Sequence, residues 1–391
     1  VVKVDNTAVA LALTTGVDTL TGSKANDTFT ADILTVGATD SIVDATTTDS
    51  DTLNMTINAA VASTFTTTNV ENINVTSLGA NAIDMTKMTG VNALSTTGST
   101  GTVTVTNAAN AGMDLGFAGS STNTISATYT ADSLSGTADK LTVNLSTATG
   151  VTATVNAGFE TAELTVTGTS SLTDLNAPGV TALTISGTGA LTIADAALAG
   201  FTGITITDTA AISTGAMTGV KTFVATANTG GIVDADIALT TTGFSDTNTI
   251  VGDTAGLSFL TGSGADNVSI TDAATSNSST IKMGAGNDII KLLNTGTAAT
   301  YVFGEAGDDT ILVADSTTAI LATDLFDGGA GTDTLVIDEA AANTWVLRGI
   351  ENVILTNSAI TANTISSSDT ALNVIAEVGS GAGDTAVNLA T

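Results

Sequence analysis

The chain has 391 residues and carries 38 acidic side chains against eight Lys and Arg, which gives a formal net charge of −30. So acidic a chain cannot neutralise phosphates, which excludes a nucleic acid as the expected partner and favours cations. The sequence contains no Cys and no His, which excludes disulfides, thiol nucleophiles, the usual zinc ligands and the commonest general base.

The residue types predict an all-β protein. Thr, Val, Ile and Gly abound and there is a single Pro, which is the composition of strands joined by tight turns. Thr interrupts every apolar run before it reaches 18 residues, so no transmembrane helix and no membrane insertion are expected. The acids are 31 Asp and 7 Glu. Asp favours turns and is a hard oxygen ligand, and a solvated acidic surface is expected to account for part of the charge.

Residues 1–68 are predicted to form an N-terminal β module. Its opening contains GSKANDTFT at 22–30, a decayed copy of a nonapeptide that occurs in full further along the chain, with Ala25 where that nonapeptide has Gly. A metal-binding role for this copy is left open. The later part of the module, 30–68, follows no repeat closely, and neither does 107–157. An insertion or a separate subdomain therefore remains possible in both ranges.

Residues 69–247 repeat with a period of about 21. NVENINVT at 69–76 is followed 21 residues later by GVNALSTT, and GFETAELTV at 158–166 is followed at the same interval by GVTALTIS. Each unit begins with Gly or Asn and then alternates apolar with polar residues, which predicts half-buried strands. A fixed period of this length indicates stacked coils that bury a core only together. The sequence therefore predicts a parallel β-solenoid, with a β-sandwich as the alternative.

Residues 248–339 contain four copies of a glycine-aspartate nonapeptide. GGAGTDTLV at 328–336 matches G-G-x-G-x-D-x-U-x in full, where U is a large apolar residue. GEAGDDTIL at 304–312 has Glu305 in place of the second Gly, and MGAGNDIIK at 283–291 and TGSGADNVS at 261–269 each lack only the first Gly. The aspartates recur every 21 to 24 residues, which is one coil, so a single column along one edge of the solenoid is predicted. The expected apolar plugs of the core are Val268, Ile290, Ile311 and Leu335.

This pattern suits Ca²⁺. Glycine lets the backbone take positive φ and expose carbonyls, the aspartate adds a carboxylate, and stacked turns bring oxygens from two coils together. Carboxylates on coils about 4.8 Å apart repel by roughly 3 kcal/mol, so a column of them needs counter-charge. Simple metal-free turns are the alternative. The predicted metal ligands are the carboxylates of Asp266, Asp288, Asp309 and Asp333, the backbone carbonyls of Gly262, Gly264, Gly284, Gly286, Gly304, Gly307, Gly329 and Gly331, and, as second choices, Asp308 and Asp327.

The four nonapeptides resemble the RTX family of secreted, calcium-binding bacterial proteins. The opening TTGVDTLTGSKANDTFTA at 14–31, the Thr/Ala/Gly-rich coils and the absence of Cys are similar to RTX-type surface-layer proteins. The resemblance implies export by type I secretion, calcium-dependent folding outside the cell and assembly into a lattice on the bacterial cell surface. The implied partners are other copies of the chain and, through another region, a cell-surface polysaccharide. Residues 340–391 are then C-terminal coils or a cap.

Two other functions stay open at this point. A calcium-dependent adhesin or biofilm-matrix protein would share composition, calcium and export, but is expected to carry long arrays of near-identical domains. The calcium-binding part of a secreted enzyme is the other alternative. Catalysis by this chain itself is not expected, because aromatic residues make up only 3% of it and a sugar-stacking cleft needs more.

Overall fold

The structure is a computed structural model, and all the regular secondary structure that it describes is β-strand. The chain forms two compact units, 1–186 and 187–391, which are treated separately below as unit 1 and unit 2. Their division falls inside the predicted segment 69–247, and parts of the predicted segments, such as 235–249, lie outside the described residues. The described residues are 6–119, 123–194, 198, 200–214, 217–225, 227–234, 250–252, 256–272, 274–295, 297–314, 320–338, 344–356, 363–367, 373–376 and 387–390.

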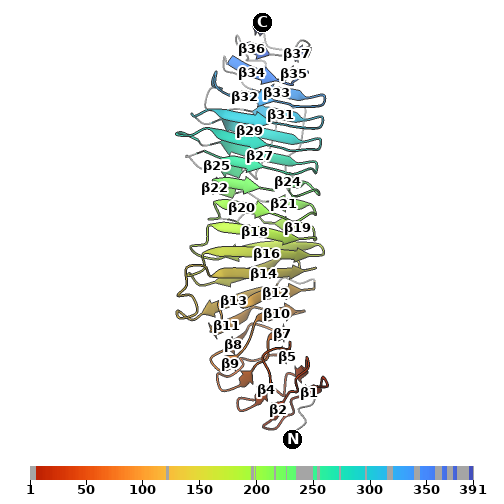
Figure 1. Ribbon diagram of the computed structural model, residues 1–391, viewed down its shortest axis with the longest axis vertical. Coiled ribbons are helices and arrows are strands. Elements are labelled where there is room, and N and C mark those ends of the chain that lie inside the picture. The colour runs from red at the N-terminus through yellow and green to blue at the C-terminus, as the bar shows by residue number, and fades with distance from the viewer. Residues whose placement is uncertain are drawn as a thin grey trace. The chain divides into compact units, whose positions relative to one another are not determined.

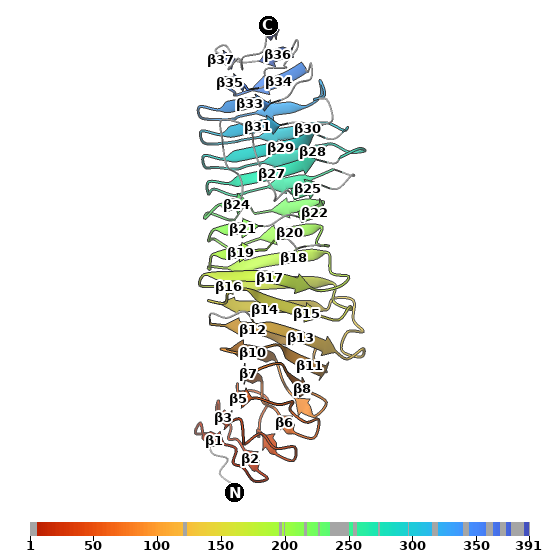
Figure 2. The ribbon, with the colours of Figure 1, turned by 180° about the vertical axis from the view of Figure 1, so that it is seen from behind.

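Unit 1 is a parallel β-solenoid with three sheets (Figures 1 and 2). Its first sheet contains β1 (Ala10–Ala12), β3 (Thr28–Ala31), β5 (Thr52–Ile57), β7 (Asn72–Ser77), β10 (Ala93–Thr97), β12 (Asp114–Ala118), β14 (Lys140–Ser146) and β16 (Thr161–Thr167), and β18 (Ala182–Gly187) ends at the division. The second contains β8 (Asn81–Asp84), β11 (Val103–Ala108), β13 (Thr124–Tyr129), β15 (Val151–Val155) and β17 (Ser170–Asn176). The third contains β2 (Thr19–Thr21), β4 (Ser41–Val43), β6 (Thr66–Thr68) and β9 (Met88–Thr89).

Unit 2 is also a parallel β-solenoid, with two long sheets. One contains β20 (Gly203–Ile206), β23 (Thr222–Val224), β26 (Ser258–Leu260), β28 (Ser279–Lys282), β30 (Thr300–Phe303), β32 (Leu325–Asp327), β34 (Thr344–Arg348), β36 (Asn363–Ser367) and β38 (Val387–Ala390). The other contains β19 (Leu191–Ile193), β21 (Ile212–Thr214), β24 (Ile232–Asp234), β27 (Asn267–Asp272), β29 (Ile289–Thr295), β31 (Thr310–Ala314), β33 (Thr334–Asp338), β35 (Asn352–Leu355) and β37 (Asn373–Ala376). Beside β27 lies β25 (Ile250–Gly252), which pairs with β22 (Met217–Val220).

The register of the coils follows the sequence repeat. Ile73 of β7 lies beside Leu94 of β10, and Leu94 beside Leu115 of β12, each one coil further along the chain. These side chains are fully buried, so apolar residues of one type of position stack into a continuous core. The predicted plugs behave in the same way: Val268, Ile290, Ile311 and Leu335 pair in that order and are all buried. The predicted all-β parallel solenoid is confirmed.

The two ranges that follow the repeat poorly continue the solenoid of unit 1. Strands β4, β5 and β6 lie between 30 and 68, and each pairs in parallel with strands of neighbouring coils. Strands β12 to β15 do the same between 107 and 157. Longer connections, such as 130–139 between β13 and β14, explain why the sequence period is lost there while the register of the sheets is kept.

Candidate metal centre

The four nonapeptides occupy equivalent corners of unit 2. Each one follows a strand of the sheet that contains β28, turns over six residues and enters a strand of the sheet that contains β29. Residues 283–288, for example, join β28 to β29. The turns themselves pair in parallel through single bridges from Ala285 to Ala306 and from Ala306 to Ala330. The coil-to-coil register therefore continues through the glycine turns, and the four aspartates come to lie one above the other.

Backbone hydrogen bonds join the four aspartates into a ladder. The amide of Asp266 donates to Oδ1 of Asp288 over 2.8 Å, the amide of Asp288 to Oδ1 of Asp309 over 2.9 Å, and the amide of Asp309 to Oδ1 of Asp333 over 2.8 Å. One further rung extends it, because the amide of Asp333 donates to Oε2 of Glu351 over 2.7 Å. Each carboxylate thus caps the amide that begins the strand of the preceding coil. We call Asp266, Asp288, Asp309 and Asp333 the aspartate column.

One carboxylate oxygen of each residue in the aspartate column has no hydrogen-bond donor. These oxygens are Oδ2 of all four side chains, and each residue is at most 2% exposed. Burial raises the pKa of Asp288 to about 7, and the charges of Asp266 and Asp309 add to that rise. Burial raises the pKa of Asp309 to about 6 and also raises those of Asp266 and Asp333. Buried polar atoms without partners are rare in folded proteins, so these oxygens are positions where a cation would bind favourably.

The glycines hold the turns close together. A Cβ on Gly307 would lie 1.8 Å from the carbonyl oxygen of Gly286, and a Cβ on Gly331 would lie 2.0 Å from that of Gly307. Both glycines have φ near +140° to +150°, where other residues are strained. At the first position of the nonapeptide, a Cβ on Gly304 would lie 2.3 Å from Oδ2 of Asp309. The side-chain oxygen without a donor therefore sits directly against a glycine.

The predicted carbonyl ligands differ in what they contact. The carbonyls of Gly262 and Gly284 accept backbone hydrogen bonds from Ala285 and Ala306 at 2.8 and 2.9 Å, so they take part in the stacking of the turns. The carbonyls of Gly264, Gly286 and Gly307 point at the glycine of the next turn, as the close Cβ approaches show, and accept none of the described hydrogen bonds. Carbonyl and carboxylate oxygens are both ligands that Ca²⁺ prefers. The carbonyl that approaches the same point as a donor-free carboxylate oxygen is that of Gly328, since a Cβ on Gly304 would lie 2.4 Å from it and 2.3 Å from Oδ2 of Asp309. The remaining predicted carbonyl ligands, Gly304, Gly329 and Gly331, lie in the same stacked turns.

The two second-choice ligands lie at the edge of the column. Asp308 is exposed, and its Oδ1 accepts the amide of Thr332 from the next coil over 2.8 Å. Asp327 ends β32, and its Oδ2 lies 3.6 Å from Nε of Arg348. A cationic side chain already faces Asp327, which makes it the less suitable of the two for a metal.

Three glutamates that motif reasoning did not select take the same structural role as the aspartates. Glu351 is the last residue of a turn of only three residues, and its longer side chain reaches the amide of Asp333. In unit 1, Glu71 accepts the amide of Asp51 over 2.9 Å and Glu160 that of Asp139 over 2.6 Å. All three occupy the third position of a repeat start, in NVEN, GFET and GIEN. That shared position is the signal that would have found them.

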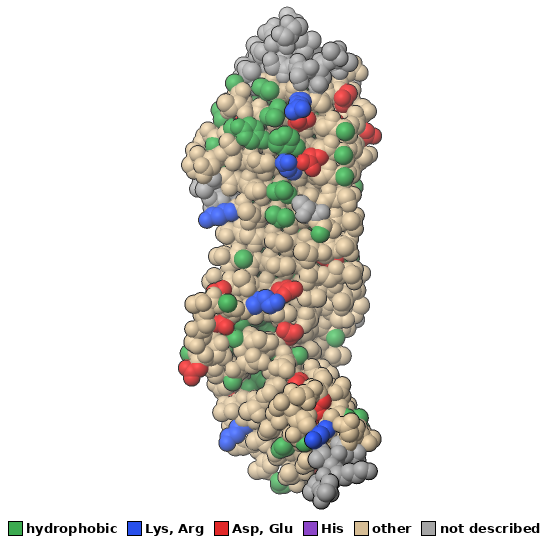
Figure 3. Space-filling model, in the orientation of Figure 1, with side chains coloured by type: hydrophobic (Ala, Val, Ile, Leu, Met, Phe, Trp, Pro, Cys, Tyr) green, Lys and Arg blue, Asp and Glu red, His purple; other side chains and the backbone are tan. Residues whose placement is uncertain are grey.

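Many of the acids are buried, so the acidic surface that composition suggests is only part of the charge. Few acidic side chains are visible on the face drawn in Figure 3, and they are scattered. Among the described residues one Lys, Lys291, is buried. Carboxylates removed from water without cations are costly unless they bind a metal or a proton. The buried acids are Asp27, Asp40, Asp44, Asp51, Glu71, Asp208, Asp266, Asp272, Asp288, Asp309, Asp324 and Asp333.

Not every buried acid lacks donors. Asp324 accepts the amides of Thr300 and Leu321, both at 2.8 Å, one on each oxygen. Asp40 in unit 1 accepts the amide of Asp18 over 2.9 Å and that of Gly37 over 2.7 Å. These two side chains are fully satisfied by the protein. Burial alone therefore does not mark a candidate site. The aspartate column combines burial, a donor-free oxygen and a common register in stacked turns, whereas Asp208 shares only the first two of these features.

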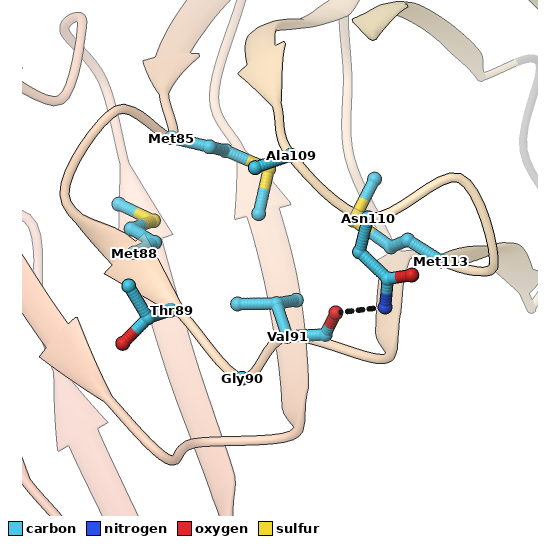
Figure 4. A pocket seen from close by; sticks show the side chains of 8 residues that line it. All are labelled: Met85, Met88, Thr89, Gly90, Val91, Ala109, Asn110 and Met113. Carbon is cyan, nitrogen blue, oxygen red and sulfur yellow. Dashed lines mark hydrogen bonds between the residues drawn. The ribbon is translucent and has the colours of Figure 1, made fainter. Parts of the chain in front are cut away.

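The pocket drawn in Figure 4 has a different character. It is a cavity of about 160 Å³ in unit 1, and Met85, Met88 and Met113 form much of its wall. Asn110 reaches into the same region and donates from Nδ2 to the carbonyl of Val91 over 2.9 Å. Its lining contains no acidic or basic side chain. The pocket offers apolar contacts, in contrast to the oxygen-lined corner of unit 2.

Comparisons with known proteins leave the family unassigned. No family model matches the chain, and no curated protein matches it. Among the described residues no helix has the length and apolar character needed to cross a membrane.

Proposed function

We propose that this chain is a structural protein of a bacterial surface layer that folds and assembles outside the cell in a calcium-dependent way. The observation that carries the proposal is the aspartate column: four buried carboxylates in one register, each with an oxygen that no protein donor satisfies. Its glycine-lined turns and oxygen ligands fit Ca²⁺ better than Mg²⁺, which demands tight octahedral geometry and keeps its waters.

The column couples folding to calcium. In the unfolded chain its aspartates are far from one another and hydrated, so a site with several ligands exists only in the folded coils. A cation that binds the folded state alone adds RT ln(1 + [L]/Kd) to its stability. Bound calcium would supply positive charge and coordinate the free oxygens. Without it, neighbouring carboxylates of the column repel one another or take up protons, as the raised pKa of Asp288 indicates. Low calcium would thus favour an unfolded, exportable chain, and high calcium a rigid one.

The described surface supports side-by-side packing of copies. Buried acids that bind calcium or a proton no longer add to the net charge, so the charge that a neighbouring copy meets would be smaller than the formal −30. The outward positions of the strands carry mainly Thr, Ser and Asn, and large apolar side chains are exposed only at Val17, Leu34 and Leu78 among the described residues. Uncharged, regular faces of this kind suit a repeated contact, with calcium bridging the remaining surface carboxylates.

The test combines far-UV circular dichroism with size-exclusion chromatography and light scattering, with and without calcium. In calcium the wild type should gain β structure and form large ordered assemblies. The double variant Asp288→Asn with Asp309→Asn should need roughly tenfold more calcium or more for both changes, because ligand charge count sets affinity. Asp324→Asn is the comparison variant, since it removes a buried carboxylate outside the column. Its amide nitrogen would face one of the two amides that Asp324 accepts, so it should lower stability but leave the calcium requirement unchanged.

The outcomes separate the alternatives. Calcium-driven folding that leaves a monomer at every concentration would reject the lattice and favour an adhesin, or the calcium-binding part of a secreted enzyme. Identical folding and assembly in excess chelator would reject the role of calcium. In that case the glycine-aspartate corners would be turns held only by their backbone ladder.

A further inference from the structure

Three buried aspartates of unit 1 converge at one corner of the solenoid. Asp27 and Asp51 immediately precede β3 and β5 of the first sheet, and Asp44 immediately follows β4 of the third. One carboxylate oxygen from each lies within 4.8 Å of the others, and the three residues are at most 2% exposed. Only Asp27 belongs to the decayed nonapeptide at 22–30, so the sequence motif does not predict this cluster.

Two of these carboxylates have an oxygen that the protein leaves without a donor. Oδ1 of Asp51 accepts the amide of Asp27 over 2.6 Å, while its Oδ2 is buried and has no partner. Oδ2 of Asp44 accepts the amide of Thr46 over 2.6 Å, while its Oδ1 is buried and has no partner. Asp27, in contrast, accepts hydrogen bonds from Val9 and Ser23. The cluster therefore presents free oxygens from two side chains beside a third, preorganised carboxylate.

The backbone leaves space for these oxygens. A Cβ on Gly22 would lie 2.3 Å from Oδ1 of Asp44 and 2.7 Å from Oδ2 of Asp27, so both oxygens converge on that glycine. The described ion pairs of the protein join Lys140 to Glu163, Lys282 to Glu305 and Arg348 to Asp327, so none of them reaches the cluster. The negative charge gathered here consequently has no cationic side chain in these pairs to offset it.

We propose that Asp27, Asp44 and Asp51 bind one divalent cation, Ca²⁺, at a site in unit 1 that is distinct from the aspartate column. Ca²⁺ takes about six to eight oxygen ligands in a flexible geometry, which suits carboxylates that come from three different turns, whereas Mg²⁺ demands a near-ideal octahedron and keeps several of its waters. Three carboxylates also exceed the charge of one such ion. Burial, followed by the charges of Asp44, Asp49 and Asp27, raises the pKa of Asp51 to about 7, which agrees with a place that lacks counter-charge.

The proposed site has a structural consequence. It ties the end of β4 to the beginnings of β3 and β5, and so joins two coils and two sheets of unit 1. Calcium should therefore slow amide hydrogen exchange between residues 22 and 57. This inference does not depend on the surface-layer function, because the cation would stabilise unit 1 whatever the chain assembles into.

The test counts bound calcium on the full chain, by elemental analysis after equilibration in calcium with excess magnesium, and follows hydrogen exchange of 22–57. Asp44→Asn should bind one ion fewer than wild type and lose the calcium-dependent protection of this segment. Asp40→Asn is the comparison variant: it removes an equally buried carboxylate at the other end of β4, outside the cluster. Its amide nitrogen would face one of the two amides that Asp40 accepts, so it should lower stability without removing a proposed ligand. It should keep the wild-type ion count and protection.

Two further variants keep the test decisive. Gly22→Ala leaves every carboxylate in place but puts a methyl group against the converging oxygens, so it should reproduce the loss even if Asp44→Asn fails to fold. The double variant Asp288→Asn with Asp309→Asn should retain calcium-dependent protection of 22–57, which distinguishes this site from the column. The proposal is overturned if calcium does not protect 22–57 in wild type, or if Gly22→Ala and Asp44→Asn keep the wild-type ion count.

Discussion

Both units use carboxylates to accept the amides at the beginnings of strands, but they differ in which carboxylate oxygens are left without a donor. In both, a carboxylate at the entrance of a strand accepts the amide of the equivalent residue in the preceding coil, as Asp288 does for Asp266 and Asp51 does for Asp27. In unit 2 the ladder runs through stacked glycine turns, and every aspartate of the column keeps a free oxygen. In unit 1 it passes from Asp27 through Asp51 to Glu71, and the free oxygen of Asp51 is joined by that of Asp44, which comes from another strand.

This difference separates a structural device from a metal site. The carboxylate-to-amide ladder exists with or without glycines, so the ladder by itself indicates nothing about calcium. What distinguishes the candidate sites is the second carboxylate oxygen. The column and the Asp27–Asp44–Asp51 cluster contain buried oxygens without donors, and those of Asp309 and Asp44 lie against a glycine. In Asp40 and Asp324, by contrast, amides satisfy both oxygens.

The largest effect is expected from crowding in the glycine turns of unit 2. Gly307→Ala places a Cβ 1.8 Å from a carbonyl of the preceding turn, whereas Gly79 in unit 1 has nearly the same φ and no atom within 4 Å of an added Cβ. Backbone strain of about 1 to 3 kcal/mol should be common to both alanine variants. Gly307→Ala alone should lower the free energy of unfolding by roughly 1 to 3 kcal/mol more, because the stacked turns must separate.

Urea unfolding in calcium-free buffer measures the stability of the two alanine variants, and hydrogen exchange localises the change. A solenoid is stabilised coil by coil and interface by interface, so the loss should centre on the coils around 283–309. Equal destabilisation by the two alanines would mean that the turns of unit 2 are not in close contact. The difference between the units would then lie elsewhere than in the glycines.

The sequence predicted those parts of the site that a local motif determines. Coil-length spacing of the nonapeptides was enough to place Asp266, Asp288, Asp309 and Asp333 in one register and their apolar neighbours in the core. The Asp27–Asp44–Asp51 cluster could not be found in this way. Asp44 comes from a different strand and a different turn length, and its approach to Asp27 depends on the third sheet, which short strands of two or three residues form.

Other features could not be predicted from the sequence, because they depend on packing rather than on residue type. The sequence indicates a chain of net charge −30 but does not say which acids are buried, and a carboxylate that caps a buried amide looks like any turn aspartate. Similarly, Gly262 and Gly284 match the motif equally well as ligands and as stacking residues. Only the hydrogen bonds from Ala285 and Ala306 reveal that their carbonyls also hold adjacent turns together.

A change of pH is expected to alter the stability contributions of two aspartates moderately and in opposite directions, those of Asp324 in unit 2 and Asp84 in unit 1. Burial raises the pKa of Asp324 to about 6, although its amide partners oppose this and the charge of Asp272 adds to it. The folded state therefore binds the proton more tightly than the unfolded state, and the stability that Asp324 contributes falls as pH rises from about 4 to about 6. Asp84 in unit 1 is half-buried, and hydrogen bonds from Thr86 and Asn107 lower its pKa. Its contribution is present above pH 4 and is lost on acidification.

Paired stability measurements at pH 7 and pH 4 in calcium-free buffer resolve the two signs. Relative to wild type, Asp324→Asn should become less stable by about 1 to 2 kcal/mol on going from pH 7 to pH 4, since each pKa unit corresponds to about 1.4 kcal/mol. Asp84→Asn should move the other way, its cost shrinking as the pH falls. A penalty for Asp324→Asn that is the same at both pH values would contradict the burial argument.

The smallest effect on stability is expected at Glu305, which replaces the second glycine in the nonapeptide at 304–312. Glu305 has φ of 75°, a conformation that costs a residue with a Cβ about 1 to 2 kcal/mol. Its exposed ion pair with Lys282, at 3.3 Å, returns at most about 1 kcal/mol. Glu305→Gly removes the strain but makes the unfolded chain more flexible, at a cost of about 0.4 to 1 kcal/mol. These opposing contributions predict a small net change in the free energy of unfolding, between a loss of about 1 kcal/mol and a gain of about 1.6 kcal/mol. Glu305→Gln keeps the strain and loses only the charge, so the difference between the two variants isolates the backbone contribution. If Glu305→Gly were less stable than Glu305→Gln, the strain at position 305 would be smaller than its φ indicates.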